Sequence, residues 1–319
     1  MKRIVVLIWL CIFCCAALCG CAETAVEHPA SGEGYTFTDD AGRAVTVTST
    51  ARVAALLGSY ADIWMLSGGS LCAAADDAWD DFSLPLGDDA VNLGGTKKLS
   101  LEALLASAPD LVLASTNTPQ HLEWEQALEG AGITVAYFDV SSFDDYLRML
   151  KICTDLTGQP QRYEQYGTAV QQQVASTTER CRSAQQEAPS SVLVLRASAG
   201  YIRAKNSEGN VLGEMLRDLG CRNIADSDAE LLENLSVESI YLQDPDHIFI
   251  VQSGDDAAGM EENLQRFFRE NPLWMELGAV ENGQVHYMDK RLYNLKPNAL
   301  WGEAVQQLEG IVIGSDKTE

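Results

Sequence analysis

Six basic residues fall in two short segments of an otherwise acidic chain. The sequence carries 22 Lys and Arg residues against 46 Asp and Glu residues, a net charge of −24. Residues 22–142 hold only four of the bases, whereas eleven follow residue 189. Six of these eleven lie in segments 196–205 and 290–296: Arg196, Arg203, Lys205, Lys290, Arg291 and Lys296. Guanidinium and ammonium groups meet anionic oxygens with charge-assisted hydrogen bonds, so this basic wall predicts a site for a ligand with anionic oxygens.

The composition also excludes several classes of function. A surface this acidic repels phosphate backbones, which argues against general nucleic-acid binding. The sequence contains no G-x-S-x-G, H-E-x-x-H or P-loop pattern, so we do not expect an enzyme. The mature chain has only four His residues, too few for the several-His sites of zinc or manganese importers: His28, His121, His247 and His286. We predict no resident metal and no cofactor, with His286 as a candidate axial ligand to a haem iron.

The N-terminus predicts export and lipid attachment. An unbroken apolar run of 15 residues, 4–18, follows two basic residues, which suits a signal peptide over residues 1–20 and is short for a membrane-spanning helix. The run ends in Leu18-Cys19-Gly20-Cys21, which resembles the lipobox of bacterial lipoproteins. Cleavage before Cys21 leaves its thiol for diacylglycerol, and residues 21–34 then form a polar lipidated tether. We expect an extracytoplasmic protein that is held on the cell membrane by lipid only.

Four cysteines of the mature chain remain besides the lipidated one: Cys72, Cys153, Cys181 and Cys221. They show no C-x-x-C spacing, so a zinc or redox motif is unsupported. Export permits disulfides, and the sequence alone does not choose among the pairings. We favour buried free thiols.

Strand-like and helix-like segments alternate through most of the chain. Residues 35–47 form two alternating runs around a turn, which predicts a hairpin. The β–α rhythm that follows predicts an α/β fold with parallel sheets covered by helices. The rhythm breaks where two helical segments follow each other without a strand, and it resumes afterwards. We therefore predict an N-terminal α/β lobe over 35–142, a helical connector over 143–189 and a C-terminal lobe over 190–319 whose final helix packs back.

The two predicted lobes share a repeated segment. Residues 100–113 (SLEALLASAPDLVL) align with 236–249 (SVESIYLQDPDHIF) on the frame S-[LV]-E, then P-D and an apolar strand. Ser caps the helix, Pro ends it, and the apolar run is a buried strand. This general helix–turn–strand pattern explains Ser, Pro and Asp better than it explains the shared glutamates, Glu102 and Glu238. We interpret the segment as a duplicated lobe.

Four segments, taken in order, resemble a known family: 36–47 (TFTDDAGRAVTV), 92–95 (NLGG), 100–115 and 293–303 (YNLKPNALWGE). Across residues 35–312 the chain resembles the substrate-binding lipoproteins of bacterial ABC importers for ferric siderophores, haem and cobalamin. The resemblance implies two Rossmann-like lobes joined by a single long α-helix, with little opening and closing and the ligand in the cleft between them. It implies a permease dimer with its ATPase as the partner, and an acidic residue on each lobe that docks on permease arginines. The matching positions are Glu102 and Glu238. We expect a monomer.

The family comparison also ranks the ligands. Cobalamin binders of this family carry an aromatic residue six positions before the first docking glutamate, where this chain has Thr96, and the second lobe has Leu232 at the matching place. We therefore expect an iron chelate, either a ferric siderophore or haem, with cobalamin as the alternative within the family. A lipid-anchored hydrolase or a surface adhesin is the alternative of another class.

Ligands of α/β lobes bind at the carboxyl ends of the strands, which selects the loops that carry the site. Aromatic residues in these loops supply flat apolar contacts, and the basic residues supply charge. The predicted ligand-binding residues are Tyr60, Trp79, Thr96, Arg196, Tyr201, Arg203, Lys205, Lys290 and Tyr293.

Overall fold

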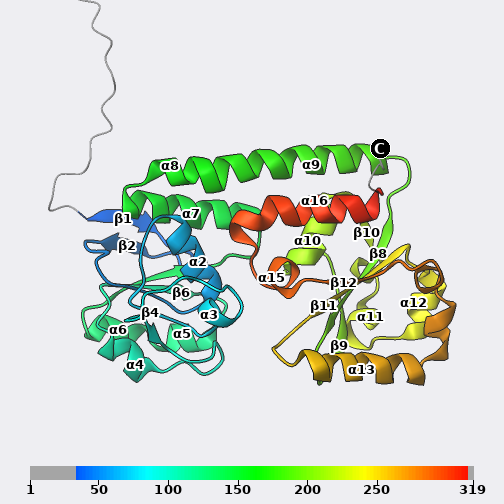
Figure 1. Cartoon of the computed structure of the whole chain (residues 1–319), viewed down its shortest axis with the longest axis horizontal. Coiled ribbons are helices and arrows are strands. Elements are labelled where there is room, and N and C mark those ends of the chain that lie inside the picture. Colours follow the sequence, from blue (N-terminus) through cyan, green and yellow to red (C-terminus); the bar gives the residue numbers. More distant parts are fainter. Residues whose placement is uncertain (1–33, 315–319) are drawn as a thin grey trace, which may run out of the picture. The chain divides into compact units, whose positions relative to one another are not determined.

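The computed structural model describes residues 34–314 (Figure 1). The predicted signal peptide, Cys21 and the tether up to residue 33 lie outside the described residues. Within the described part, no helix combines the length and the apolar character that crossing a membrane requires. Two α/β lobes with parallel sheets, joined by a long helix, confirm the predicted fold class.

The N-terminal lobe is built on a parallel sheet with the strand order β5-β4-β3-β6-β7. The strands are β3 (Val53–Ala55), β4 (Ala73–Ala74), β5 (Val91–Asn92), β6 (Leu111–Ser115) and β7 (Thr134–Phe138). The helices are α2 (Gly58–Leu66), α3 (Asp77–Asp80), α4 (Leu101–Ala106), α5 (Pro119–Glu123) and α6 (Glu125–Gly130). The predicted hairpin is present as antiparallel β1 (Tyr35–Thr38) and β2 (Ala44–Val47). Apolar side chains fill both faces of the sheet, as parallel sheets covered by helices require.

The connector begins with α7 (Phe143–Thr157), which packs on α2. Ser142 and Asp145 form a capping box at its start, and Gly158, with φ of 66°, ends it in the left-handed conformation that glycine adopts readily. The chain then runs without a strand through α8 (Pro160–Tyr163), the π-helical turn η1 (Glu164–Thr168) and α9 (Ala169–Gln185). These segments form the long helix that Figure 1 shows reaching from one lobe to the other.

The C-terminal lobe repeats the parallel plan with one antiparallel addition. Its sheet has the order β10-β8-β11-β12, and β9 pairs antiparallel with β8. The strands are β8 (Ser191–Ala197), β9 (Ile202–Lys205), β10 (Arg222–Asn223), β11 (His247–Gln252) and β12 (Val285–Met288). The helical segments are α10 (Val211–Asp218), η2 (Ile224–Asp226), α11 (Ala229–Glu233), α12 (Val237–Gln243), α13 (Ala257–Glu270), η3 (Pro272–Glu276), α14 (Gly278–Glu281), α15 (Lys290–Tyr293), η4 (Asn298–Leu300) and α16 (Trp301–Val312).

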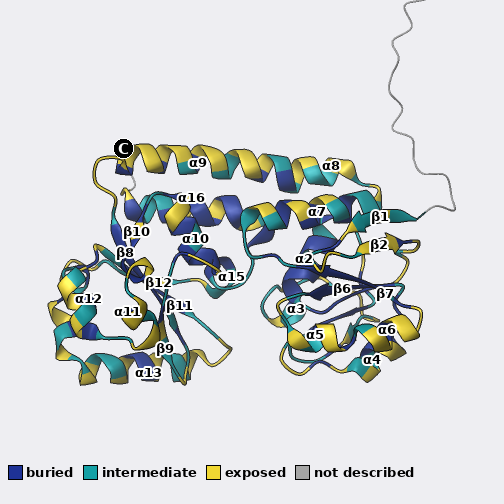
Figure 2. Cartoon of the chain, turned by 180° about the vertical axis from the view of Figure 1, so that it is seen from behind, coloured by how far each residue is buried: buried dark blue, intermediate teal, exposed yellow. Residues whose placement is uncertain are grey.

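The last helix, α16, lies along α9, and Arg180 and Glu309 form an ion pair between them. Figure 2 shows the inner strands β3, β6, β8 and β11 largely buried and much of α9 and α13 exposed. Cys72, Cys153, Cys181 and Cys221 all have free thiols, and the last three are buried.

The repeated segment has the same local structure in both lobes. Ser100 and Ser236 accept the backbone N–H groups of Ala103 and Ser239, both at 3.1 Å, and so cap α4 and α12 as predicted. The residues before the two prolines, Ala108 and Asp244, both have positive φ, 45° and 37°. An unusual backbone conformation at equivalent positions supports the interpretation of a repeat.

Two local predictions need correction. The sequence predicts one helix over residues 120–130, but the structure has two short ones, because the chain turns at Trp124, whose side chain is buried in the core. Segment 196–205, predicted as a loop after a strand, is a β-hairpin in which Ile202–Lys205 forms β9. The hairpin determines how the basic residues are arranged.

Candidate ligand-binding site

The β8–β9 hairpin places three of the predicted basic residues on one face of the sheet. Arg196 and Arg203 are direct cross-strand partners, and Lys205 pairs with Val194, two residues before Arg196. Cross-strand partners point to the same side, and so do residues two apart on one strand. Arg196, Arg203 and Lys205 therefore form one cationic cluster near the carboxyl end of β8, where ligands of such folds bind.

No carboxylate neutralises this cluster among the described residues. None of the ion pairs found within residues 34–314 includes any of the three side chains. The Nε atom of Arg196 is buried and has no hydrogen-bond partner. Burial lowers the pKa of Arg196, and burial together with the charges of Arg196 and Arg203 lowers that of Lys205. Like charges opposite each other in a sheet are destabilising, so an anion bound here would relieve their repulsion.

Tyr201 and Ser253 hold one side of the cationic cluster. The guanidinium carbon of Arg203 lies 5.0 Å from the centre of the Tyr201 ring, a cation–π arrangement. The Tyr201 hydroxyl hydrogen-bonds to Ser253 Oγ at 2.9 Å, next to the carboxyl end of β11. Ser253 is not among the predicted contacts, because only the fold brings the loop after β11 beside the hairpin. Its one signal in the sequence is its place in a loop at a strand end.

Lys296 approaches the cationic cluster from the segment after α15. Burial is the main cause that lowers the pKa of Lys296, and the charge of Arg196 lowers it further. The carboxylates of Asp139, Glu214 and Asp145 act in the opposite direction. Asp139 follows the carboxyl end of β7 in the other lobe. The Lys296 ammonium thus extends the positive charge of the cluster toward the strand ends of the N-terminal lobe.

Lys290 and Arg291, by contrast, are neutralised by aspartates. Lys290 Nζ lies 2.8 Å from a carboxylate oxygen of Asp81 and 2.6 Å from one of Asp255. Arg291 donates to Asp62 at 2.9 Å, and its guanidinium carbon lies 3.9 Å from the centre of the Phe82 ring. The predicted ligand contact at Lys290 is corrected: in this structure Lys290 joins the strand-end loops of the two lobes.

Two of the predicted aromatic contacts belong to the core. Tyr60 is 2% exposed and its hydroxyl donates to the carbonyl of Phe138 at 2.9 Å. Tyr293 is 1% exposed and donates to the carbonyl of Ala304 at 3.0 Å. Both rings support the loops from beneath, and neither is open to a ligand. Trp79, in α3, packs partly against the N-terminal core, and Thr96 is half-buried in the loop after β5; as ligand contacts both stay predictions.

His286 is not placed to bind the iron of a haem at the cationic cluster. It is the second residue of β12, and its Nε2 lies 3.3 Å from Nδ1 of His247, the first residue of β11. The two rings lie toward the amino ends of their strands, and the cationic cluster lies at the carboxyl end of β8. The suggestion that His286 is an axial ligand to a haem iron is therefore wrong for a haem at the cationic cluster, because His286 lies toward the other end of the sheet.

Acidic side chains occupy the corresponding place in the N-terminal lobe. Asp77, at the start of α3, accepts the backbone N–H of Gly58 at 2.8 Å. Burial is the main cause that raises the pKa of Asp77 to about 6, and the charges of Asp76 and Asp81 add to it. The strand-end loops of the two lobes therefore carry opposite charge.

The two repeat glutamates remain accessible. Glu102 and Glu238 are exposed in the first turns of α4 and α12, and no ion pair within residues 34–314 involves either of them. Ser236 Oγ donates to Glu238 at 3.2 Å.

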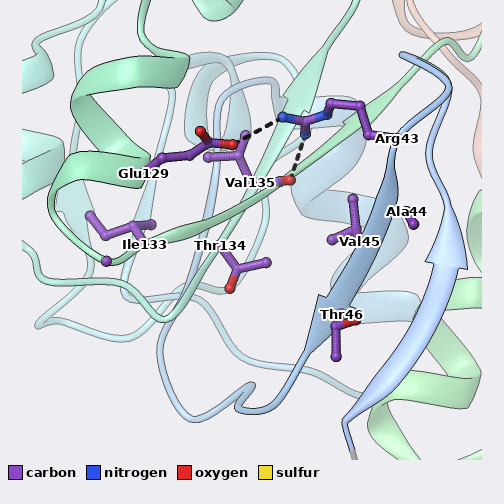
Figure 3. Close-up of a pocket in the computed structure, with 9 residues that line it drawn as sticks. Arg43, Ala44, Val45, Thr46, Glu129, Ile133, Thr134 and Val135 are labelled. Carbon is purple, nitrogen blue, oxygen red and sulfur yellow. Dashed lines mark hydrogen bonds and ion pairs between the residues drawn. The ribbon is translucent and has the colours of Figure 1, made fainter.

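Two hollows elsewhere in the described residues lack the features of this site. One, of about 320 Å³, lies beside β2 and the start of β7 (Figure 3). Its cation, Arg43, is committed to Asp39, Glu125, Glu129 and the carbonyl of Val135. The other, of about 300 Å³, lies between the connector and α16 and is lined by Asp144, Glu214 and Asp218 among others. Neither presents a free positive charge at a strand end.

Comparison with known proteins settles the family. The sequence profile described as "Periplasmic binding protein" matches residues 53–292, which span both sheets. The chain belongs to the periplasmic binding protein family. This membership confirms that the protein is a binding protein and not an enzyme.

One curated relative resembles this periplasmic binding protein in sequence, and two solved structures resemble it in fold. It is 26% identical over 200 residues to the iron-uptake system-binding protein of Bacillus subtilis, a match that covers 62% of this chain and 61% of the relative. The crystal structure of Staphylococcus aureus SirA complexed with staphyloferrin B superposes with a TM-score of 0.65, at 22% identity over 86% of this chain and 96% of SirA. A periplasmic heme binding protein from Pseudomonas aeruginosa gives a TM-score of 0.66, at 22% identity over 83% and 94% of the two chains.

The two solved structures support the fold. The sequence match to the curated relative covers only part of that relative's length. The chain spans between three fifths and two thirds of the length of the curated relatives it matches.

Proposed function

We propose that this chain is the substrate-binding lipoprotein of an ABC importer and that it captures an anionic ferric siderophore. The observation that carries the proposal is the cationic cluster of Arg196, Arg203 and Lys205, which has no carboxylate partner among the described residues of a chain with a net charge of −24. A ligand between the lobes would meet this cluster on one side and the loops after β4 and β5 on the other.

The chemistry of the cluster favours a siderophore over haem. A ferric siderophore presents several anionic oxygens around its iron, and two arginines with a lysine on one face offer several donors to them. The protein then needs no side chain on the metal. Haem is the second candidate, since a haem-binding relative shares the fold and haem carboxylates also suit the cluster. Its iron would need an axial ligand, for which Tyr201 is the nearest candidate, and the Tyr201 hydroxyl is already bonded to Ser253.

The importer itself is the proposed partner. Glu102 and Glu238 are exposed at equivalent places in the two lobes, and each would dock on a basic residue of one permease subunit. A permease dimer with its ATPase, and a monomeric binding protein, complete the proposed assembly.

Attachment to the cell membrane is proposed through the lipid on Cys21. Two or more acyl chains hold a protein on a membrane far more firmly than one. We expect Cys21→Ser to release the protein into the medium or the periplasm, measured by cell fractionation. A variant that stays in the membrane fraction would favour an uncleaved N-terminal helix instead.

A fluorescence titration tests the proposed ligand. Five of the six Trp residues follow the predicted signal peptide, and Trp79 lies at a predicted contact, so a bound ferric complex should quench their emission. The purified protein is titrated with ferric catecholate, carboxylate and hydroxamate siderophores, with haem and with cobalamin. Saturable one-to-one quenching by an anionic ferric siderophore supports the proposal. Saturation only by haem or only by cobalamin would contradict it and select the alternative.

A further inference from the structure

Two histidines meet at the end of the C-terminal sheet that lies away from the cationic cluster. His247 is the first residue of β11. His286, on β12, is the cross-strand neighbour of Phe249 on β11. His247 Nδ1 and His286 Nε2 lie 3.3 Å apart, and both rings are half-buried. His247 precedes Val251, the partner of Arg196, by four residues, which is about 13 Å along a strand. The pair is therefore separate from the proposed siderophore site.

The separation of the two nitrogens suits a metal ion. Two imidazole nitrogens bound to one tetrahedral ion at about 2.0–2.1 Å lie roughly 3.3 Å from each other. The same distance lies just above the range of about 2.7–3.2 Å that is typical of N–H···O hydrogen bonds. The two nitrogens thus already have nearly the separation that a shared ion requires, so its binding needs no movement of the backbone.

The rings are also held and charged as metal ligands need to be. The centre of the Phe249 ring lies 5.2 Å from that of His286 and 6.1 Å from that of His247, so packing limits their rotation. An imidazole of ordinary pKa, about 6.5, is mostly neutral at pH 7.5, and the neutral form is the one that binds metal. The nearby carboxylate of Asp246 is bonded to Ser191, and its negative charge favours a cation close by.

We propose that His247 and His286 form a binding site for one divalent transition-metal ion of the borderline class, Zn²⁺, Ni²⁺ or Cu²⁺. Within residues 34–314 no third His, Cys, Asp or Glu joins them as a ready ligand, so water completes the coordination. Two imidazoles with water favour Cu²⁺ over Ni²⁺ and Zn²⁺. The site is independent of the siderophore proposal, because it uses neither the same residues nor the same kind of ligand.

Copper binding by the mature chain tests the site directly. The protein is stripped with a chelator and titrated with Cu²⁺ and with Zn²⁺ by calorimetry, and the Cu²⁺ complex is examined by electron paramagnetic resonance. We expect one ion per chain and a spectrum with coupling to two imidazole nitrogens. The variants H247Q and H286Q should each weaken binding about tenfold or more, since each removes a direct ligand. Circular dichroism checks that both variants fold.

The matched control is H28Q, because His28 falls in the predicted tether, outside the described residues. It should bind copper as the parent does. Binding that disappears in H28Q but persists in H247Q would overturn the proposal, as would a spectrum without two-nitrogen coupling. Absence of saturable binding of either ion would also overturn it and leave the pair as a hydrogen bond. If the titration with siderophores fails while copper binds, only the proposed function is affected.

Discussion

The two lobes share a folding plan but carry opposite charges at the ends of their strands. Each has a parallel sheet covered on both faces and the same capped helix before a central strand. In the N-terminal lobe the segment after β4 carries aspartates such as Asp77 and Asp81, and in the C-terminal lobe Arg196 lies near the end of β8 with Arg203 beside it. The repeat therefore preserves the scaffold, and the loops at the strand ends decide which lobe meets an anion.

The comparison also explains why the basic wall divides in two. Lys290 and Arg291 lie within reach of the aspartates of the N-terminal lobe and are neutralised by Asp81 and Asp62. Arg196 and Arg203 lie on the hairpin, where no carboxylate approaches them among the described residues. The basic residues that link the lobes thus lie apart from the basic residues that remain free for a ligand.

The largest expected effect concerns the hairpin. The double variant Arg196→Gln/Arg203→Gln should weaken binding of an anionic ferric siderophore by about 1–3 kcal/mol for each charge-assisted hydrogen bond that it removes. Fluorescence titration of parent and variant measures the change. Lys290→Gln is the matched control and should bind almost as the parent does. If Lys290→Gln costs as much affinity as the double variant, the division between linking and ligand-binding charge is wrong.

The next effect concerns the contact between the lobes. Asp62→Asn should lower the free energy of unfolding by about 1–3 kcal/mol, because it leaves the largely buried Arg291 guanidinium without its anion. Asp255→Asn is the control: Asp255 is 91% exposed, and Lys290 keeps Asp81. Urea denaturation followed by circular dichroism compares the two.

A double variant sharpens this test. Burial is the main cause that raises the pKa of Asp62 and lowers that of Arg291, so both ions are held against a desolvation cost. Asp62→Asn/Arg291→Met should therefore be less destabilised than Asp62→Asn alone. A double variant that is less stable than the single one would mean that Arg291 stabilises the fold through its other contacts, the Phe82 ring and the carbonyl of Lys296.

A smaller effect tests the acidic loop of the N-terminal lobe. The folded-state pKa of Asp77, about 6, is above its ordinary value of 3.8, so folding opposes its ionisation. Its contribution to stability therefore falls as the pH rises from about 4 to 6 and stays lost above that range. Asp77→Asn keeps an oxygen for the Gly58 N–H and should stabilise the protein by about 1 kcal/mol at pH 7.5 but little at pH 4. Denaturation curves at both pH values, with exposed Asp80→Asn as control, measure the difference; an equal gain at both would contradict it.

The smallest effect on stability should come from the repeat glutamates. Glu102→Ala and Glu238→Ala each remove one anion from a helix N-terminus, which amounts to about 0.3–1 kcal/mol. If they dock on the permease, the double variant should fold and bind ligand normally yet fail in uptake, and each single variant should be milder. Melting temperature, ligand titration and uptake by whole cells are measured on the same proteins. Normal uptake by the double variant would refute the docking role.

Local signals in the sequence are sufficient for most of the scaffold. Capping serines at Ser100 and Ser236, the glycine that ends α7, and apolar runs of strand length predict elements that the structure contains. These signals depend on neighbours within a few residues, so they survive without tertiary context. Short pieces such as β5 and β9 escape prediction because two to four residues carry too little periodicity.

The sequence by itself determined the α/β class, the repeat and the excess of positive charge near the strand ends of the C-terminal lobe. The tertiary structure alone decided which of those charges are free. Lys290 meets Asp81 across 209 positions of the chain, and Arg196 meets Arg203 through a hairpin register. It also turned Tyr60 and Tyr293 into core residues and brought His247 to His286. Ion pairing and burial depend on which side chains packing brings within a few ångströms, and residue types along the chain do not state that distance.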